Sequence, residues 1–370
     1  MIIGSVNSMV FHLLLISMIS ALAQPTSEAP KKEILVGVNY FAGWWEALPN
    51  KWHDSTGRDW RPDYPGRAPL LGMFNTQETM DQEIRAASGN GVDFFLILWY
   101  PVHTIPNPEP GLASLNAGVD QYVHSPESGR MKFAIEFCNH DPFVVKTDEE
   151  WQRCIQAWLP ALGHPAYLKI DGKLFFKFHS LHHLYKHCGQ DINLCRQRIE
   201  SLREAVRKAG LGEMLIGCGV SAHEKIGAGH PACQLFEFTT TYMDVPTGDQ
   251  TPLDHPYEEI ADHAHQGRLA HAEDALPYIP YLPAGWNPRP WHDPRPCYQL
   301  PNREQWRHAL EQIKHDLQGN PRLGFPHQKM FTIYAWNEYG EGGIVAPTQG
   351  DQAMKLEVIR EVFPTQSIKP

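Results

Sequence analysis

The chain has 370 residues, of which 42% are hydrophobic and 20% are charged, and its mean hydropathy is −0.39. It is therefore long enough to bury a sizeable core, and its composition is that of an ordinary globular protein. The formal net charge is −10 and no run of Lys or Arg forms a stripe, which argues against a nucleic-acid partner.

The N-terminal part of the chain carries an apolar run at residues 9–23, interrupted by His12 and Ser17. The run is too short to span a bilayer and ends in Ala21-Leu22-Ala23, the small-x-small pattern of a cleavage site. We interpret residues 1–23 as a secretory signal peptide, although its first residues carry no Lys or Arg, and residues 24–32 as a linker. A membrane anchor is the alternative, but the run is short for one. The mature protein is then expected to be secreted or periplasmic, with no membrane span.

Seven cysteines fit a non-cytoplasmic compartment, and the odd number leaves at least one thiol free. Cys188 and Cys195 bracket a short polar segment and are the most plausible local disulfide. Cys138 and Cys218 lie in strand-like runs, where a thiol behaves as a small buried hydrophobe.

Eight short apolar runs predict buried strands, at residues 34–40, 92–99, 131–137, 174–178, 214–220, 236–243, 278–282 and 330–336. Amphipathic helical segments lie between most of them, at residues 77–88, 148–162, 195–209, 257–265 and 303–317. This alternation predicts parallel strands with helical crossovers, and eight such units favour an α/β fold of the (β/α)8 TIM barrel type over residues 33–364, with 365–370 as a tail. The short stretch between Val220 and Phe236 leaves little room for a helix, so a doubly wound open sheet is the competing fold.

The active site of such a barrel lies at the C-terminal ends of the strands, in the loops that follow them. Two of these loops, residues 43–76 and 283–302, are long and rich in Trp, and we expect them to form an aromatic cleft; packing as a lid is the alternative. A carbohydrate pocket needs aromatic faces for the sugar rings and fixed polar partners for the hydroxyls. The strand ends offer the following candidates for substrate binding: Tyr40, Trp44, Trp45, Trp99, Glu136, Asn139, His179, Tyr242, Trp286, Asn287, Trp336 and Asn337.

The last predicted strand leads directly into a loop that holds two acids, Glu338 and Glu341. Glycoside hydrolysis needs one carboxyl to protonate the leaving oxygen and a second on the other side of the anomeric centre, roughly 5 to 9.5 Å away. Two acids three residues apart in a turn can meet this need. The alternative is a solvated acidic turn, because Glu-x-x-Glu also occurs by chance.

The sequence from Trp336 to Gly342, WNEYGEG, resembles the Trp-Asn-Glu-Trp-x-Glu-Gly motif of glycoside hydrolase family 99, the endo-α-mannosidase family, and of the WbsX-like glycan-processing proteins. Further matches extend over most of the mature chain in order, in the segments 37–40, 43–45, 167–173 and 283–287. Tyr339 departs from the motif's second Trp, Asn287 stands where relatives often have Asp, and His140 stands where WbsX-like chains tend to have Glu. These departures lie near the expected sugar contacts, so they affect the expected α-mannoside specificity more than the paired acids.

The resemblance implies a retaining (β/α)8 glycosidase in which the substrate's 2-hydroxyl acts as nucleophile. Glu338 would then assist that hydroxyl, and Glu341 would be the general acid/base. Because a general acid must be protonated near neutral pH, we expect burial and the like-charged neighbour to raise the pKa of Glu341.

Two other functions remain open from the sequence. One is a non-catalytic glycan-binding barrel. The other is a metal-dependent hydrolase that uses a cluster of His179, His182, His183 and His187, in which two histidines have i, i+4 spacing but no strong zinc motif accompanies them. We favour the glycosidase, acting as a monomer on a carbohydrate without a metal or cofactor.

Overall fold

The computed structural model describes residues 32–246 and 254–364. The predicted signal peptide, the predicted linker up to residue 31 and the predicted tail lie outside the described residues. Within the described ranges, no helix has both the length and the apolar character needed to cross a bilayer.

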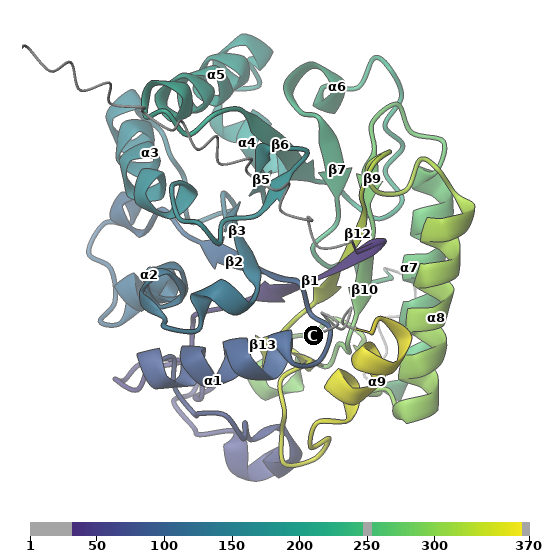
Figure 1. Ribbon diagram of the computed structural model, residues 1–370. Coiled ribbons are helices and arrows are strands. Elements are labelled where there is room, and N and C mark those ends of the chain that lie inside the picture. Colours follow the sequence, from purple (N-terminus) through teal and green to yellow (C-terminus); the bar gives the residue numbers. More distant parts are fainter. Residues whose placement is uncertain (1–31, 247–253, 365–370) are drawn as a thin grey trace, which may run out of the picture. The chain divides into compact units, whose positions relative to one another are not determined.

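The described residues form a closed barrel of parallel strands (Figure 1). Its strands are β1 (Ile34–Tyr40), β2 (Phe94–Trp99), β3 (Lys132–Phe137), β5 (Lys173–Phe178), β6 (Met214–Gly219), β7 (Phe238–Thr240), β9 (Tyr278–Ile279), β10 (Tyr281–Pro283) and β12 (Lys329–Tyr334). Only Pro280 separates β9 from β10. Proline lacks the backbone N–H that a strand ladder needs, so it interrupts the strand. The two pieces together count as one of eight strands in the ring.

The ring closes because β9 pairs with β7 on one side while β10 pairs with β12 on the other, and β12 pairs in turn with β1. The (β/α)8 prediction is therefore confirmed. The competing open sheet is wrong, since an open sheet would leave two strand edges unpaired.

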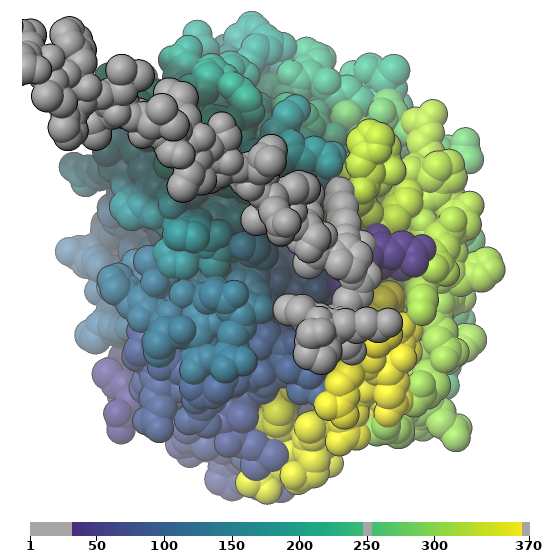
Figure 2. Space-filling model, viewed as in Figure 1, coloured from purple at the N-terminus to yellow at the C-terminus, as the bar shows by residue number. Residues whose placement is uncertain are grey.

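Helices surround the barrel: α1 (Gln77–Ser88), α2 (Ala117–His124), α3 (Asp148–Leu162), α4 (Leu181–His187), α5 (Ile192–Lys208), α6 (Ala232–Leu235), α7 (Tyr257–His271), α8 (Arg303–Gly319) and α9 (Met354–Val362). Figure 2 shows α9, in yellow, packed between the blue residues of α1 and the light green α8. Helices α1 and α3 begin at the predicted residues, and the side chains of Thr76 and Thr147 cap them by accepting hydrogen bonds from backbone N–H groups.

The elements differ from prediction mainly after β6. The crossover to β7 holds only the four-residue α6, in the stretch that the sequence marked as too short for a full helix. Strand β7 has three residues instead of the predicted eight. Short pairs complete the structure: β4 (Lys169–Ile170) with β5, β8 (Asp254–His255) with β11 (Cys297–Tyr298), and β13 (Asn337–Glu338) with β14 (Gly343–Ile344).

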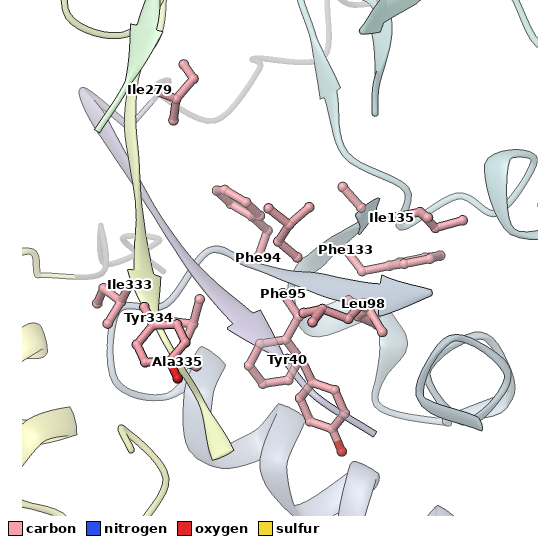
Figure 3. Packing of buried hydrophobic residues seen from close by; sticks show 14 of the residues in the cluster. Tyr40, Phe94, Phe95, Leu98, Phe133, Ile135, Ile279, Ile333, Tyr334 and Ala335 are labelled. Atoms are coloured by element: carbon pink, nitrogen blue, oxygen red, sulfur yellow. The ribbon is translucent and has the colours of Figure 1, made fainter. Parts of the chain in front are cut away.

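The N-terminal end of the barrel interior holds the rings of Phe94, Phe175, Phe238 and Phe325, whose neighbouring centroids lie 4.7 to 6.5 Å apart. Figure 3 shows Phe94 among other buried hydrophobic residues of the cluster. Gly37 lies opposite Phe94 and Gly217 opposite Phe238 in the sheet register, and a Cβ at either glycine would fall about 2 Å from the neighbouring ring. The glycines therefore leave the space that the Phe rings occupy. Because apolar rings seal this end, polar side chains gather nearer the C-terminal ends of the strands.

Candidate active site

A buried charged layer lies above the aromatic rings. Oε1 of Glu136 is 2.8 Å from Nζ of Lys177 and 2.7 Å from Nδ1 of His179, and Oε2 accepts a 2.8 Å hydrogen bond from Asn39. Glu136 and Lys177 are both fully buried. Burial alone would raise the pKa of Glu136, but the ammonium of Lys177 and the imidazole of His179 outweigh it, so the pKa is lowered.

Glu338 and Glu341 lie in the tight turn that follows β12. The backbone carbonyl of Glu338 accepts hydrogen bonds from the N–H groups of Glu341 (3.1 Å) and Gly342 (2.8 Å), and β13 pairs with β14 across the turn. The hydroxyl of Tyr242, after β7, donates to Oε1 of Glu338 over 2.9 Å, and the hydroxyl of Tyr334, in β12, donates to Oε2 of Glu341. Each carboxyl thus accepts a hydrogen bond from a different tyrosine.

Both carboxyls hold protons more tightly than exposed acids do. Burial, followed by the like charge of Glu341, raises the pKa of Glu338 to about 8. Burial also raises the pKa of Glu341, against the opposing effects of the Tyr334 hydroxyl and the Arg295 guanidinium. The expected rise at Glu341 is confirmed, and the repulsion between the two acids acts on Glu338. Because the two carboxyls interact, the protonation of one depends on the charge of the other.

The loop after β1 and the loop after β10 build an aromatic wall behind this turn. Trp52 is fully buried, with ring centroids 4.3 Å from Trp44 and 5.5 Å from Tyr339. Trp291 also stacks on Trp44, with ring centroids 6.3 Å apart. Tyr339, the residue that departs from the family motif, is thus a buried packing residue of this wall.

Three asparagines fasten strand ends to neighbouring segments. Asn337 accepts from the backbone N–H of Phe41 and donates to its carbonyl, each over 2.9 Å. Asn139 makes the same reciprocal pair with Ser180, at 2.8 and 3.0 Å. Asn116 does so with Tyr100, at 2.7 Å for both bonds. Asn337 and Asn139 were predicted to bind substrate, but here their amides are engaged with backbone.

Two cavities lie at this end of the barrel. One of about 680 Å³ is lined by residues of the loop after β1, among them Lys51 and His53, and by Trp291. Another of about 270 Å³ lies over the ends of β3, β5, β6 and β7 and reaches His179 and Tyr242. Tyr242 links the smaller cavity to Glu338.

No family model matches this sequence, and no curated protein matches it. Solved structures do match. A protein described as glycoside hydrolase-like has a TM-score of 0.61 at 17% identity, over 90% of this chain and 95% of that one. A GH99 endo-alpha-mannosidase from Bacteroides thetaiotaomicron has a TM-score of 0.52 at 16% identity, over 89% and 95%. A GH5_18 protein from Streptomyces cattleya has a TM-score of 0.51 at 13% identity, over 90% and 80%.

These likenesses show the fold. The chain shares the barrel of the GH99 endo-alpha-mannosidase, as the motif around Glu338 predicted, and the structures named here are described as glycoside hydrolases or as like them.

The predicted substrate-binding residues divide by the direction of their side chains. Glu136, His179 and Tyr242 belong to the polar network around the acid pair. Trp286 and Asn287 lie beside it, since the N–H of Asn287 donates to the carbonyl of Glu341 over 2.6 Å. Nε1 of Trp286 and Oδ1 of Asn287 are buried without a hydrogen-bond partner among the described residues, which suits them to meet a ligand.

Other predicted residues are engaged in packing or in hydrogen bonds within the protein. Tyr40 is outside the barrel wall, where its hydroxyl donates to Glu83 of α1 over 2.8 Å. Trp336 packs in the same layer, 5.1 Å from Phe95. Trp99 packs against Trp158 of α3. Trp44 belongs to the aromatic wall, and Trp45 is partly buried and donates to the carbonyl of Pro49.

The site also holds three residues that were not predicted from the sequence: Lys177, Tyr334 and Lys51. Lys177 could have been found, since it is the one charged residue among the apolar side chains in the interior of β5, at the alternation that points inward. Tyr334 was included in a predicted strand without a role. Lys51 carries no local signal, because its place depends on how a long loop folds back.

Two of the α4 histidines lie beside an acidic residue of the loop after β3. His183 and His187 face Asp141, with Nε2 of His187 3.0 Å from its carboxylate, and Lys186 binds the same carboxylate over 2.6 Å. In the described parts of the chain, no group of three or more His, Cys, Asp or Glu residues is arranged to hold a metal ion.

The predicted disulfide is wrong, because Cys188 and Cys195 are both thiols. Arg198 donates to Sγ of Cys188 over 3.6 Å, and the thiol of Cys195 donates to the carbonyl of Leu184 over 3.9 Å. Cys138 and Cys218 are buried thiols, as predicted.

Proposed function

We propose that the protein is a glycoside hydrolase that cleaves glycosidic bonds in a polysaccharide or glycan, with Glu338 and Glu341 as its catalytic pair. The observation that carries the proposal is the pair itself. Two carboxyls lie three residues apart at the C-terminal end of a (β/α)8 barrel, each bonded by a tyrosine and each with a raised pKa.

The proposed mechanism retains configuration. A raised pKa keeps one proton on the pair near neutral pH, and that proton can pass to the leaving oxygen. We assign this step to Glu341 and assistance of the substrate's 2-hydroxyl to Glu338, following the family 99 pattern. The Tyr242 and Tyr334 hydroxyls orient the two carboxyls, and Trp286 and Asn287 offer polar groups to the sugar.

We also propose that the enzyme acts as a monomer outside the cytoplasm, after removal of residues 1–23. N-terminal sequencing of secreted protein tests the cleavage site before Gln24, and light scattering tests the oligomeric state.

The function is tested by incubating purified protein with a panel of neutral and acidic glycans and identifying products by mass spectrometry. The proposal predicts cleavage of at least one glycan, no effect of EDTA, and loss of turnover in Glu341→Gln. Cleavage abolished by EDTA would favour a metal-dependent hydrolase, while binding without cleavage by the wild type would favour a glycan-binding barrel.

A further inference from the structure

Lys51 occupies an unusual position in the loop after β1. Its Nζ lies 5.0 Å from the ring centroid of Trp291 and 5.9 Å from that of Phe41, so the ammonium rests on two aromatic faces. Its backbone carbonyl accepts hydrogen bonds from the indole N–H groups of Trp60 (2.8 Å) and Trp291 (3.1 Å). Both ends of the residue are therefore held in place.

The turn that carries the acids also builds this platform. A Cβ on Gly340 would lie 2.2 Å from the ring of Trp291, so only a glycine between the two acids lets that ring approach. Trp52, next to Lys51, stacks on Tyr339 at 5.5 Å. The loop after β1 is thus fastened directly to the turn from Glu338 to Glu341.

The acid pair needs a counter-charge. Ionising one of two buried carboxyls leaves a negative charge that must be compensated, because an unpaired buried charge is costly. Of the cations near the pair, Lys177 is 2.8 Å from Glu136 and Arg295 is 2.6 Å from Asp293. For Lys51, no carboxylate of residues 32–246 or 254–364 lies within ion-pair distance, so its charge is not committed to one partner.

The ammonium of Lys51 acts on both acids together. Burial raises the pKa of both carboxyls, and the positive charge of Lys51 opposes that rise at Glu338 and at Glu341. At Glu341 the guanidinium of Arg295 opposes it more strongly. A cation that favours the ionised form of both carboxyls stabilises whichever one is charged, and leaves them free to exchange the proton.

We propose that Lys51 is a positioning residue of the reaction, whose ammonium, held on Phe41 and Trp291, compensates the single negative charge that the Glu338–Glu341 pair shares. This inference rests on the proposed function for its catalytic consequence. Its electrostatic part does not depend on that function.

Other ionisable groups also face the pair or Lys51, and none of these residues is replaced in the variants below. They are Tyr100, Tyr242, Tyr334, Asp293 and Arg295 around the pair, and His53, Asp54 and His292 around the loop.

The first test is the pH dependence of kcat in Lys51→Met. Removing the cation raises the pKa values of both carboxyls, so the whole pH–rate profile moves to higher pH by on the order of one unit. Lys51→Arg restores most of the wild-type profile, and Trp291→Leu, which keeps the charge but removes its platform, gives an intermediate shift. Lys208→Met, an exposed lysine of α5, is the matched control and leaves the profile unchanged.

A purely structural role for Lys51 would lower kcat without moving the profile, and a Lys51→Met profile that superimposes on the wild type overturns the proposal. The second test needs no activity. NMR titration of protein labelled with 13C at the Glu carboxyls, assigned with Glu338→Gln and Glu341→Gln, predicts higher pKa values for both acids in Lys51→Met.

The two tests separate the proposals. A protein that cleaves no glycan but shows shifted carboxyl titrations refutes the proposed function and keeps the role of Lys51. An active enzyme with unshifted titrations does the reverse.

Discussion

The hydroxyl of Tyr242 donates a 2.9 Å hydrogen bond to Oε1 of Glu338, although the two residues are 96 positions apart in the chain. The bond joins the end of β7 to the turn after β12. Tyr242 also has His179 at 4.9 Å and the ammonium of Lys177 at 5.6 Å from its ring centroid. It is therefore the contact through which the charged layer around Glu136 meets the acid pair.

Replacement of Tyr242 by Phe removes that hydrogen bond and leaves the ring. Since the bond lowers the pKa of Glu338, its loss raises this pKa further, and Glu338 is less often ionised at neutral pH. We expect kcat to fall about 10- to 100-fold, with the acid limb of the pH–rate profile at higher pH. Tyr185→Phe, on α4, is the control; equal kcat values for the two variants would contradict the role of Tyr242.

The pair predicts a loss of activity in alkaline solution. Turnover needs one proton on the two carboxyls, and that proton leaves as the pH rises through the pKa of about 8. We expect kcat to decline above about pH 8, which a pH–rate profile on any cleaved glycan measures. Undiminished kcat at pH 10 would show that neither acid donates a proton.

Glu83 predicts a pH-dependent stability unrelated to catalysis. Burial raises its pKa from 4.5 to about 7, against the hydrogen bond from Tyr40. The folded state therefore binds this proton more tightly than the unfolded state, so the stabilisation is complete below pH 4.5 and is lost as the pH rises through 7. The loss amounts to about 3 kcal/mol for this group.

The comparison of wild type with Glu83→Gln isolates this effect, because other shifted groups contribute equally to both proteins. Urea denaturation at several pH values between 4.5 and 8 measures the difference in unfolding free energy. That difference should change in favour of the variant as the pH rises, and a constant difference would contradict the raised pKa.

The strands and the acid pair could be predicted from the sequence, but the direction of individual side chains could not. Strand runs and Glu338 follow from hydrophobic periodicity and from a local motif. Successive strand residues point to opposite faces, so an error of one position exchanges interior for exterior. Tyr40, at the end of β1, therefore lies under α1, and its neighbour Asn39 points into the barrel and binds Glu136.

Residues in loops were harder to place for another reason. An asparagine after a strand suits a sugar hydroxyl and a backbone peptide equally well, and only the folded structure shows which it meets. The ring stack of Trp52 on Tyr339 likewise joins segments far apart in the chain, which no local pattern indicates.

The Asn337 clamp predicts a linked loss of stability and activity. Asn337→Ala removes two buried hydrogen bonds to Phe41 and leaves both backbone groups without those partners, which should cost about 3 kcal/mol of unfolding free energy. Because Glu338 is the next residue, the same change loosens the acid pair, and we expect kcat to fall at least about 10-fold.

Asn139→Ala breaks the equivalent pair of hydrogen bonds to Ser180, away from the acid pair, and is the matched variant. It should lose similar stability but less kcat; if Asn139 instead contacts the sugar, its replacement will raise KM with little effect on unfolding.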